Sequence, residues 1–85
     1  MAEKHVLIVD DAIELGRLLQ SAVQTLDASL KLTVVPSAEE AILASSRHTV
    51  QLLISDVRLP GMSGFDLAER MRKRNPNLEV ILITG

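Results

Sequence analysis

Three acidic residues follow two short apolar segments, and their positions suggest a site for chemistry. Asp56 ends the strand-like segment 51–56, and Asp10 and Asp11 follow the apolar segment 6–9. If the two segments are parallel strands lying side by side, their carboxyl ends share one edge of a sheet, and the three carboxylates converge there. Packed acids repel one another unless a cation or a proton relieves the charge. The spacing therefore predicts a metal-dependent acidic site.

The oxygen ligands of this site indicate which ion and which reaction would suit it. Carboxylates favour hard cations such as Mg²⁺, which binds one or two of them and keeps positions open for phosphoryl oxygens. A carboxylate in this setting can also be the nucleophile that accepts a phosphoryl group. The hydroxyl of Thr84, which follows another apolar segment, can donate a hydrogen bond to a phosphoryl oxygen.

The segments that must position these residues alternate between strand-like and helix-like patterns. Runs rich in leucine and β-branched residues predict strands over 5–9, 31–35, 52–54 and 78–84. Apolar residues at helical spacing predict helices over 12–26, 37–47 and 64–74. The order βαβαβαβ predicts an α/β fold with a doubly wound parallel sheet, right-handed crossovers and ligand binding at the carboxyl ends of the strands.

Capping residues mark the starts of the predicted helices. Asp11 is expected to cap the first helix and Ser63 the third, and Ser37 stands at capping-box spacing from Glu40 before the second. The first helix is expected to present one apolar stripe, formed by Leu15, Leu18, Leu19, Ala22, Val23 and Leu26.

Composition restricts the class of protein. The 85 residues carry a net charge of -2 and contain no cysteine, so they fit one small domain without disulfides or a thiolate metal site. Bulk charge calls for neither nucleic acid nor an acidic membrane as a partner. The longest apolar run, 80–83, is too short to span a bilayer. The basic run at 70–74 is interpreted as a solvated helix end, so no direct nucleic-acid binding is expected.

Three motifs taken together resemble the receiver domain of bacterial two-component response regulators. They are Val-Asp-Asp at 9–11, Ser-Asp-Val-Arg-Leu-Pro-Gly-Met-Ser-Gly at 55–64 and Ile-Leu-Ile-Thr-Gly at 81–85, in the order and spacing of the family. The resemblance implies a flavodoxin-like fold and a place in a phosphorelay. It also implies a cytoplasmic signalling module, not an enzyme, that takes a phosphoryl group from a sensor histidine kinase onto one aspartate.

The same resemblance implies a role for each residue at the site. Asp56 matches the phosphoacceptor of the family. Asp11 and Asp56 match direct ligands of Mg²⁺, Asp10 matches a ligand that acts through water, and the backbone carbonyl of Arg58 matches the remaining protein ligand. Thr84 matches the switch hydroxyl that turns toward the phosphoryl group.

Residues 1–85 match only part of the receiver pattern. A receiver continues with another helix, a fifth strand that ends in a lysine near the phosphoryl group, and a final helix. Lys73 lies on the third predicted helix and cannot take the place of that lysine. We therefore expect a partial receiver, truncated after its fourth strand, in which phosphorylation is slow or its signal uncoupled.

The fourth predicted strand is expected to be an edge of the sheet. In the flavodoxin-like strand order, 2-1-3-4-5, the segment 78–84 would lie inside the sheet if a fifth strand followed it. An apolar edge without that strand is a template for pairing with another chain. We therefore expect a homo-oligomer, such as a dimer, formed through this edge by strand pairing or domain swapping.

Other interpretations fit parts of the pattern. The chain could be a non-phosphorylated, self-associating interaction module, or a metal-dependent hydrolase, although it lacks an Asp-x-Asp loop and an obvious general base. Thr84 could be an ordinary strand threonine. His5 and His48 have no partners at ligand spacing and are expected at the surface, whereas Met62 and Phe65 are expected to pack near the turn.

Overall fold

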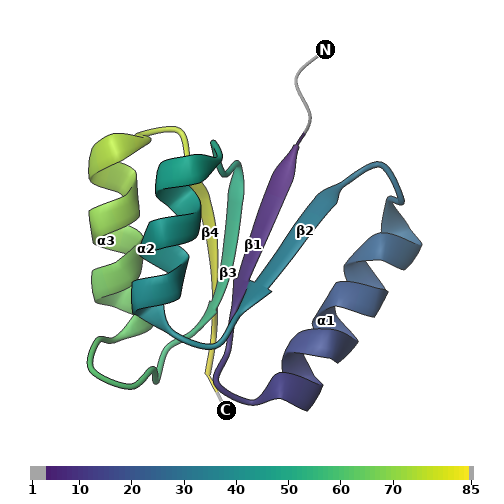
Figure 1. Ribbon diagram of the computed structural model, residues 1–85, viewed down its shortest axis with the longest axis horizontal. Helices are drawn as coiled ribbons and strands as arrows, with labels where there is room; N and C mark the ends of the chain where they lie inside the picture. The colour runs from purple at the N-terminus through teal and green to yellow at the C-terminus, as the bar shows by residue number, and fades with distance from the viewer. Residues whose placement is uncertain (1–3, 85) are drawn as a thin grey trace.

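Four parallel strands form a single sheet in the computed structural model, which describes residues 4–84. The strands lie in the order β2-β1-β3-β4 and are β1 (His5–Val9), β2 (Lys31–Val35), β3 (Leu52–Asp56) and β4 (Glu79–Ile83). The three helices are α1 (Ile13–Leu26), α2 (Ala38–Arg47) and α3 (Gly64–Arg74). Helix α1 covers one face of the sheet, and α2 and α3 cover the other (Figure 1). The predicted α/β fold with a doubly wound parallel sheet is confirmed.

The carboxyl ends of the strands share one edge of the sheet, at the lower end of Figure 1. Strand β3 reaches this edge at Asp56, two residues beyond the predicted end at Ile54, because Asp56 still pairs with Ile83 of β4. Strand β4 is shorter than the predicted 78–84. The N–H of Leu78 donates to the Asn75 carbonyl at 3.1 Å in a turn before the strand.

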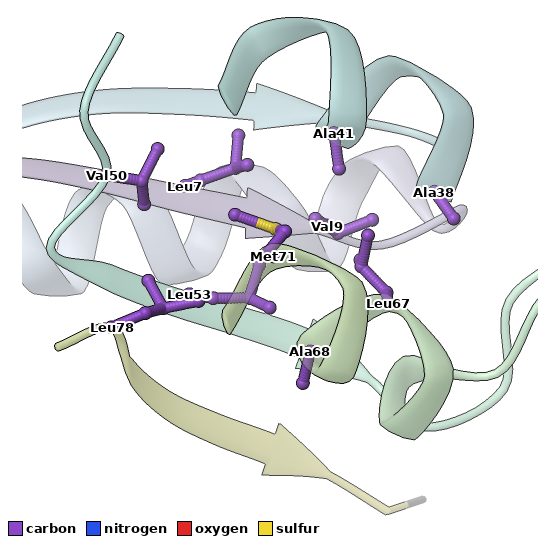
Figure 2. Packing of buried hydrophobic residues seen from close by; sticks show 10 residues of the cluster. All are labelled: Leu7, Val9, Ala38, Ala41, Val50, Leu53, Leu67, Ala68, Met71 and Leu78. Carbon is purple, nitrogen blue, oxygen red and sulfur yellow. The ribbon is translucent and has the colours of Figure 1, made fainter. Parts of the chain in front are cut away.

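A buried apolar layer joins the sheet to α2 and α3. Leu7 of β1 and Leu53 of β3 belong to one buried cluster with Ala41 of α2 and with Leu67 and Met71 of α3 (Figure 2). Helices α2 and α3 therefore turn their apolar faces toward the sheet. Each fully buried leucine stabilises the fold by roughly 1.5–3 kcal/mol, so this layer anchors the two helices that flank β3.

The single apolar stripe predicted for α1 is only partly buried. Leu19 and Val23 pack against the core on this face of the sheet. Leu15, Leu18 and Leu26 are exposed, Leu26 by 86%. Part of the predicted apolar stripe of α1 therefore packs against the sheet, and the rest faces solvent.

The contact between α1 and β2 explains why the buried stripe is narrow. Gly16 is buried, and a Cβ atom placed on it would lie 2.8 Å from Cγ1 of Val34 in β2. The backbone of α1 thus lies close against β2 at Gly16, and Leu19 and Val23 follow on the same helical face. Helix α1 lies closest to β1 and β2.

Two of the three predicted helix caps are confirmed. The hydroxyl of Ser37 accepts the N–H of Glu40 at 3.2 Å, and that of Ser63 accepts the N–H of Asp66 at 3.1 Å. The predicted cap at Asp11 is wrong, because Ala12 holds the N-cap position of α1 without a side-chain cap. The chain is extended at Ala12, so the helix begins one residue later than a cap at Asp11 would require.

Replacing Ser63 with alanine is expected to destabilise the fold by about 1 kcal/mol, because the N–H of Asp66 loses its acceptor at the start of α3. Urea unfolding monitored by circular dichroism measures the change. Ser21→Ala, on the exposed surface of α1, is the matched control and should shift the free energy of unfolding by less than about 0.5 kcal/mol. Equal effects of the two substitutions would show that the Ser63 cap does not stabilise α3.

Two further side chains, those of His5 and Phe65, differ from their expected environments. His48 is exposed as expected, whereas His5 is partly buried. The two rings stack with centroids 4.8 Å apart, and Nε2 of His5 lies 3.0 Å from Oγ1 of Thr33. Phe65 is 62% exposed and does not pack in the turn. Met62 packs against the core as expected.

Candidate functional site at the carboxyl ends of the strands

The three acidic residues singled out in the sequence lie together in the structure. Strand β1 is the parallel neighbour of β3, with Val9 paired to Ser55, so the residues after Val9 end beside Asp56. One carboxylate oxygen from each of Asp10, Asp11 and Asp56 lies within 4.8 Å of the other two. Asp10 is buried, Asp56 is partly buried and Asp11 is exposed. The cluster therefore opens to solvent on the side of Asp11.

Asp10 has one carboxylate oxygen that is satisfied and one that is not. Its Oδ1 accepts the N–H of Ala12 at 2.8 Å, which fixes the side chain over the start of α1. Its Oδ2 is buried and has no hydrogen-bond partner, and no other buried side-chain polar atom in residues 4–84 is in this position. A buried carboxylate oxygen without a partner is unfavourable. A cation held by the neighbouring oxygens would satisfy it, so the residues present fit a hard metal ion.

Asp56 is held by contacts of both its side chain and its backbone. Its Oδ1 accepts the N–H of Arg58 at 3.0 Å, which folds the following turn back over the carboxylate. The hydroxyl of Ser55, which is fully buried, donates to the Asp56 carbonyl at 2.9 Å. The N–H of Val57 donates to the carbonyl of Ile83 at 3.0 Å. Asp56 is therefore fixed in position before any ligand arrives.

Gly64 lies against the same carbonyl of Asp56. Its N–H donates to the Val57 carbonyl at 2.8 Å, closing the loop between β3 and α3. A Cβ atom on Gly64 would overlap the Asp56 carbonyl oxygen and would lie 3.1 Å from Cα of Val57. No side chain fits there without displacing the backbone that carries Asp56. Gly61, in the same loop, has a positive φ of 76°, a conformation that favours glycine.

Thr84 and Arg58 lie at the same edge of the sheet as the acids. Thr84 follows Ile83, the register partner of Asp56, and is exposed just beyond the end of β4. The N–H of Arg58 is bound to Asp56, and the Arg58 residue is exposed. The roles of Thr84 as a hydroxyl donor and of the Arg58 carbonyl as a metal ligand remain predictions.

Two contacts that hold Asp56 were not predicted from the sequence, those of Ser55 and Gly64. Ser55 is a polar residue inside an otherwise apolar strand, and this signal could have identified it as a partner of nearby backbone. The close approach of Gly64 to Asp56 joins two segments separated by a loop, and its cause is visible only in three dimensions.

Comparison with known proteins identifies what this arrangement resembles. The family model described as the response regulator receiver domain matches residues 6–85. The transcriptional regulatory protein DctD of Pseudomonas aeruginosa is 35% identical over 99% of the chain, and NtrC of Klebsiella pneumoniae is 36% identical over 92%. The chain spans 18% of the length of DctD and 16% of that of NtrC.

A solved structure gives the corresponding comparison in three dimensions. The response regulator protein TrrA of Thermotoga maritima, in complex with Mg²⁺-BeF, superposes with a TM-score of 0.86 at 30% sequence identity. The match covers 95% of this chain and 69% of the TrrA chain. The parallel sheet and the order of its elements are thus those of receiver domains.

Proposed function

The chain belongs to the response regulator receiver domain family, and from this premise we propose that Asp56 accepts a phosphoryl group in a two-component phosphorelay. Receiver domains are signalling modules that interact with histidine kinases, and a sensor histidine kinase is the proposed donor. The observation that carries the proposal is the convergence of the Asp10, Asp11 and Asp56 carboxylates at the carboxyl ends of β1 and β3.

Receiver domains bind Mg²⁺ at their acidic pocket, and the three clustered aspartates are compatible with it. We propose Asp11, Asp56 and the Arg58 carbonyl as direct ligands, with Asp10 acting through water. The unpartnered Oδ2 of Asp10 supports this set of ligands. It is a buried acceptor that would be satisfied by a cation or by a hydrogen-bond donor. When bound, the ion would offset the negative charge of the phosphoryl oxygens.

The contacts of Asp56 support a proposal for which of its two carboxylate oxygens is the nucleophile. Oδ1 is bound to the N–H of Arg58, so Oδ2 is the proposed nucleophile. A new bond forms between Oδ2 and phosphorus, while the bond from phosphorus to the donor breaks and its electron pair leaves with the donor group. The Ser55 and Gly64 contacts hold the backbone of Asp56 during this step. The Thr84 hydroxyl is proposed to donate to a phosphoryl oxygen of the product.

Further proposals concern the setting of the domain. We propose that residues 1–85 form the front part of a receiver domain, which fits the 69% of the TrrA chain that they match. No helix in residues 4–84 has the length and apolar character needed to cross a membrane.

A cytoplasmic location is proposed because two-component regulators receive their phosphoryl group there. A second proposed partner is another copy of the chain, bound along the edge strand β4.

Incubation with Mg²⁺ and acetyl phosphate is expected to add one phosphoryl group to the chain, because Asp56 can displace acetate from this small donor. Intact-mass spectrometry measures the adduct. The Asp56→Asn variant should show none. Asp66→Asn, which changes an exposed acid at the start of α3, is the matched control and should be modified like the unaltered chain.

Two results would contradict the proposed phosphoacceptor. One is an adduct that survives Asp56→Asn. The other is the absence of any adduct on a chain that circular dichroism shows to be folded, a result that would favour a non-phosphorylated interaction module. Omitting Mg²⁺ should reduce the yield of adduct, because the phosphoryl oxygens then approach three uncompensated carboxylates.

A further inference from the structure

Helices α2 and α3 lie side by side on one face of the sheet, and two adjacent hollows open between them (Figure 1). One hollow has a volume of about 320 Å³ and the other of about 210 Å³. Ser45 of α2 and both Met71 and Arg74 of α3 line the two hollows, which together form the α2–α3 groove.

The α2–α3 groove does not depend on the edges of the sheet. Its lining residues fall between positions 42 and 78. Helix α2 lies over β1 and β2, and α3 lies over β3 and β4. A right-handed crossover from β4 to a further strand would place its helix on the outer side of α3, away from α2. A strand added beyond β4 therefore leaves the groove as it is.

The floor of the groove is apolar. Met71 is buried beneath both hollows, and Ile42 is half-buried beside the larger one. Val50 and Leu78 are buried at the smaller one. Covering such a floor with apolar side chains is favourable, because it removes apolar surface from water.

Three cations stand along the α3 wall of the groove. Arg70, Lys73 and Arg74 are exposed and fall at helical positions i, i+3 and i+4, so they share one face of α3. None of the three has a hydrogen bond or an ion pair within residues 4–84. Arg72 differs, because its Nε donates to the Leu78 carbonyl at 3.2 Å. Neighbouring like charges on a helix repel one another, so a negatively charged ligand would relieve the three cations.

The acids on the same helix lie outside the groove. Asp66 and Glu69 share a separate hollow with Arg70 and Lys73, one turn earlier on α3. Arg74 lines both hollows of the groove, and the residue four positions before it is Arg70 rather than an acid. The charge of Arg74 is therefore the least offset of the three.

We propose that the α2–α3 groove binds an acidic amphipathic peptide segment of a partner protein. Apolar side chains of the peptide fill the two hollows over Met71, and carboxylates along its flank pair with the three cations of α3. Ile42 and Ser45, which α2 contributes to the groove, carry no charge, so the carboxylates face α3. The groove shares no residue with the acidic cluster, and the proposal does not depend on phosphorylation of Asp56.

The combination of an apolar floor and a basic wall selects this occupant. A small inorganic anion would pair with the cations but leave the floor in water, whereas a neutral apolar peptide would cover the floor and leave the cations uncompensated. A nucleic acid would be repelled by the rest of the chain, whose net charge is -2. An acidic amphipathic peptide satisfies both parts of the groove.

Filling the groove tests the proposal. The probes are an array of fluorescent helical peptides that vary the apolar residues of one face and keep glutamates beside them, with binding measured by anisotropy. Ser45→Trp should weaken the binding of the selected peptide by at least about tenfold, because the indole occupies the hollows. Ser46→Trp is the matched control and should bind normally, since Ser46 lines neither hollow although both hydroxyls donate to the carbonyl three residues earlier.

The basic wall is tested separately. Arg74→Gln should weaken binding of the same peptide by about two- to fivefold, whereas Arg17→Gln, an exposed cation of α1, should leave the affinity unchanged. Replacing the glutamates of the peptide with glutamine should reduce the difference between Arg74→Gln and the unaltered chain. Circular dichroism checks that each variant folds.

Several results would overturn the proposal. The first is no saturable binding by any peptide of the array, and the second is an equal loss of affinity in Ser45→Trp and Ser46→Trp. Tripolyphosphate or a single-stranded oligonucleotide that displaces the peptide and binds Ser45→Trp undiminished would show that the wall is only an anion-binding patch. Asp56→Asn should bind the peptide normally, so a failure here is distinguishable from a failure of the phosphoacceptor proposal.

Discussion

Replacing Gly64 with alanine is expected to destabilise the fold by about 1–3 kcal/mol and to weaken Mg²⁺ binding sharply. The added Cβ would overlap the Asp56 carbonyl oxygen and crowd Val57, and overpacking against backbone can be relieved only by moving that backbone. Because Asp56 is the residue displaced, its carboxylate would leave the position in which it meets Asp10 and Asp11. Urea unfolding measures the first effect, and the Mg²⁺-dependent rise in melting temperature measures the second.

Gly61→Ala separates loss of stability from loss of the site. Gly61 has a positive φ of 76°, but a Cβ atom there would have nothing within 4 Å. The substitution therefore costs about 1–2 kcal/mol through backbone conformation alone and should leave Mg²⁺ binding intact. If Gly64→Ala bound Mg²⁺ as well as Gly61→Ala does, the close approach of Gly64 would have no part in positioning Asp56.

The part of the site that could be predicted from sequence depends on the direction of the strands and on β1 and β3 being neighbours. Alternating strands and helices require parallel strands, and parallel strands bring their carboxyl ends to one edge. Asp10 follows β1, and Asp56 ends β3. Their proximity can therefore be predicted without knowledge of any side-chain contact. The inner face of α3, with Leu67 and Met71, was predictable for a similar reason, because helical periodicity marks the face that a sheet must cover.

The predictions that differ from the structure concern helix α1, namely which of its apolar residues are buried and which residue caps it. Periodicity identifies the apolar residues of α1 but does not show which of them contact the sheet. Because α1 lies close to β2 at Gly16, Leu19 and Val23 are packed against the core and Leu26 is exposed. The cap at Asp11 failed because the Asp10 carboxylate binds the N–H of Ala12 in the turn before α1. The first outcome depends on tertiary packing, which a local pattern does not contain. The second depends on a side-chain contact between residues two positions apart.

Replacing Asp10 with asparagine is expected to have opposite effects with and without Mg²⁺. Without the ion, the variant should be more stable than the unaltered chain by about 1–3 kcal/mol, because the unpartnered buried Oδ2 is removed. The new amide can donate to the nearby carboxylates of Asp11 or Asp56, and the acceptor for the Ala12 N–H is retained. Thermal unfolding in a chelating buffer measures this gain.

With Mg²⁺ present, the difference in free energy of unfolding between Asp10→Asn and the unaltered chain should become smaller or change sign. An ion at 100 times its dissociation constant stabilises the unaltered chain by about 2.7 kcal/mol. Asp10→Asn lowers the negative charge of the cluster, so the variant should gain much less from the same concentration. Asp27→Asn, an exposed acid after the end of α1, is the control and should keep the full gain. An unchanged Mg²⁺ response in Asp10→Asn would mean that Asp10 takes no part in holding the ion. A variant less stable than the unaltered chain in chelator would mean that its buried oxygen is already satisfied without metal.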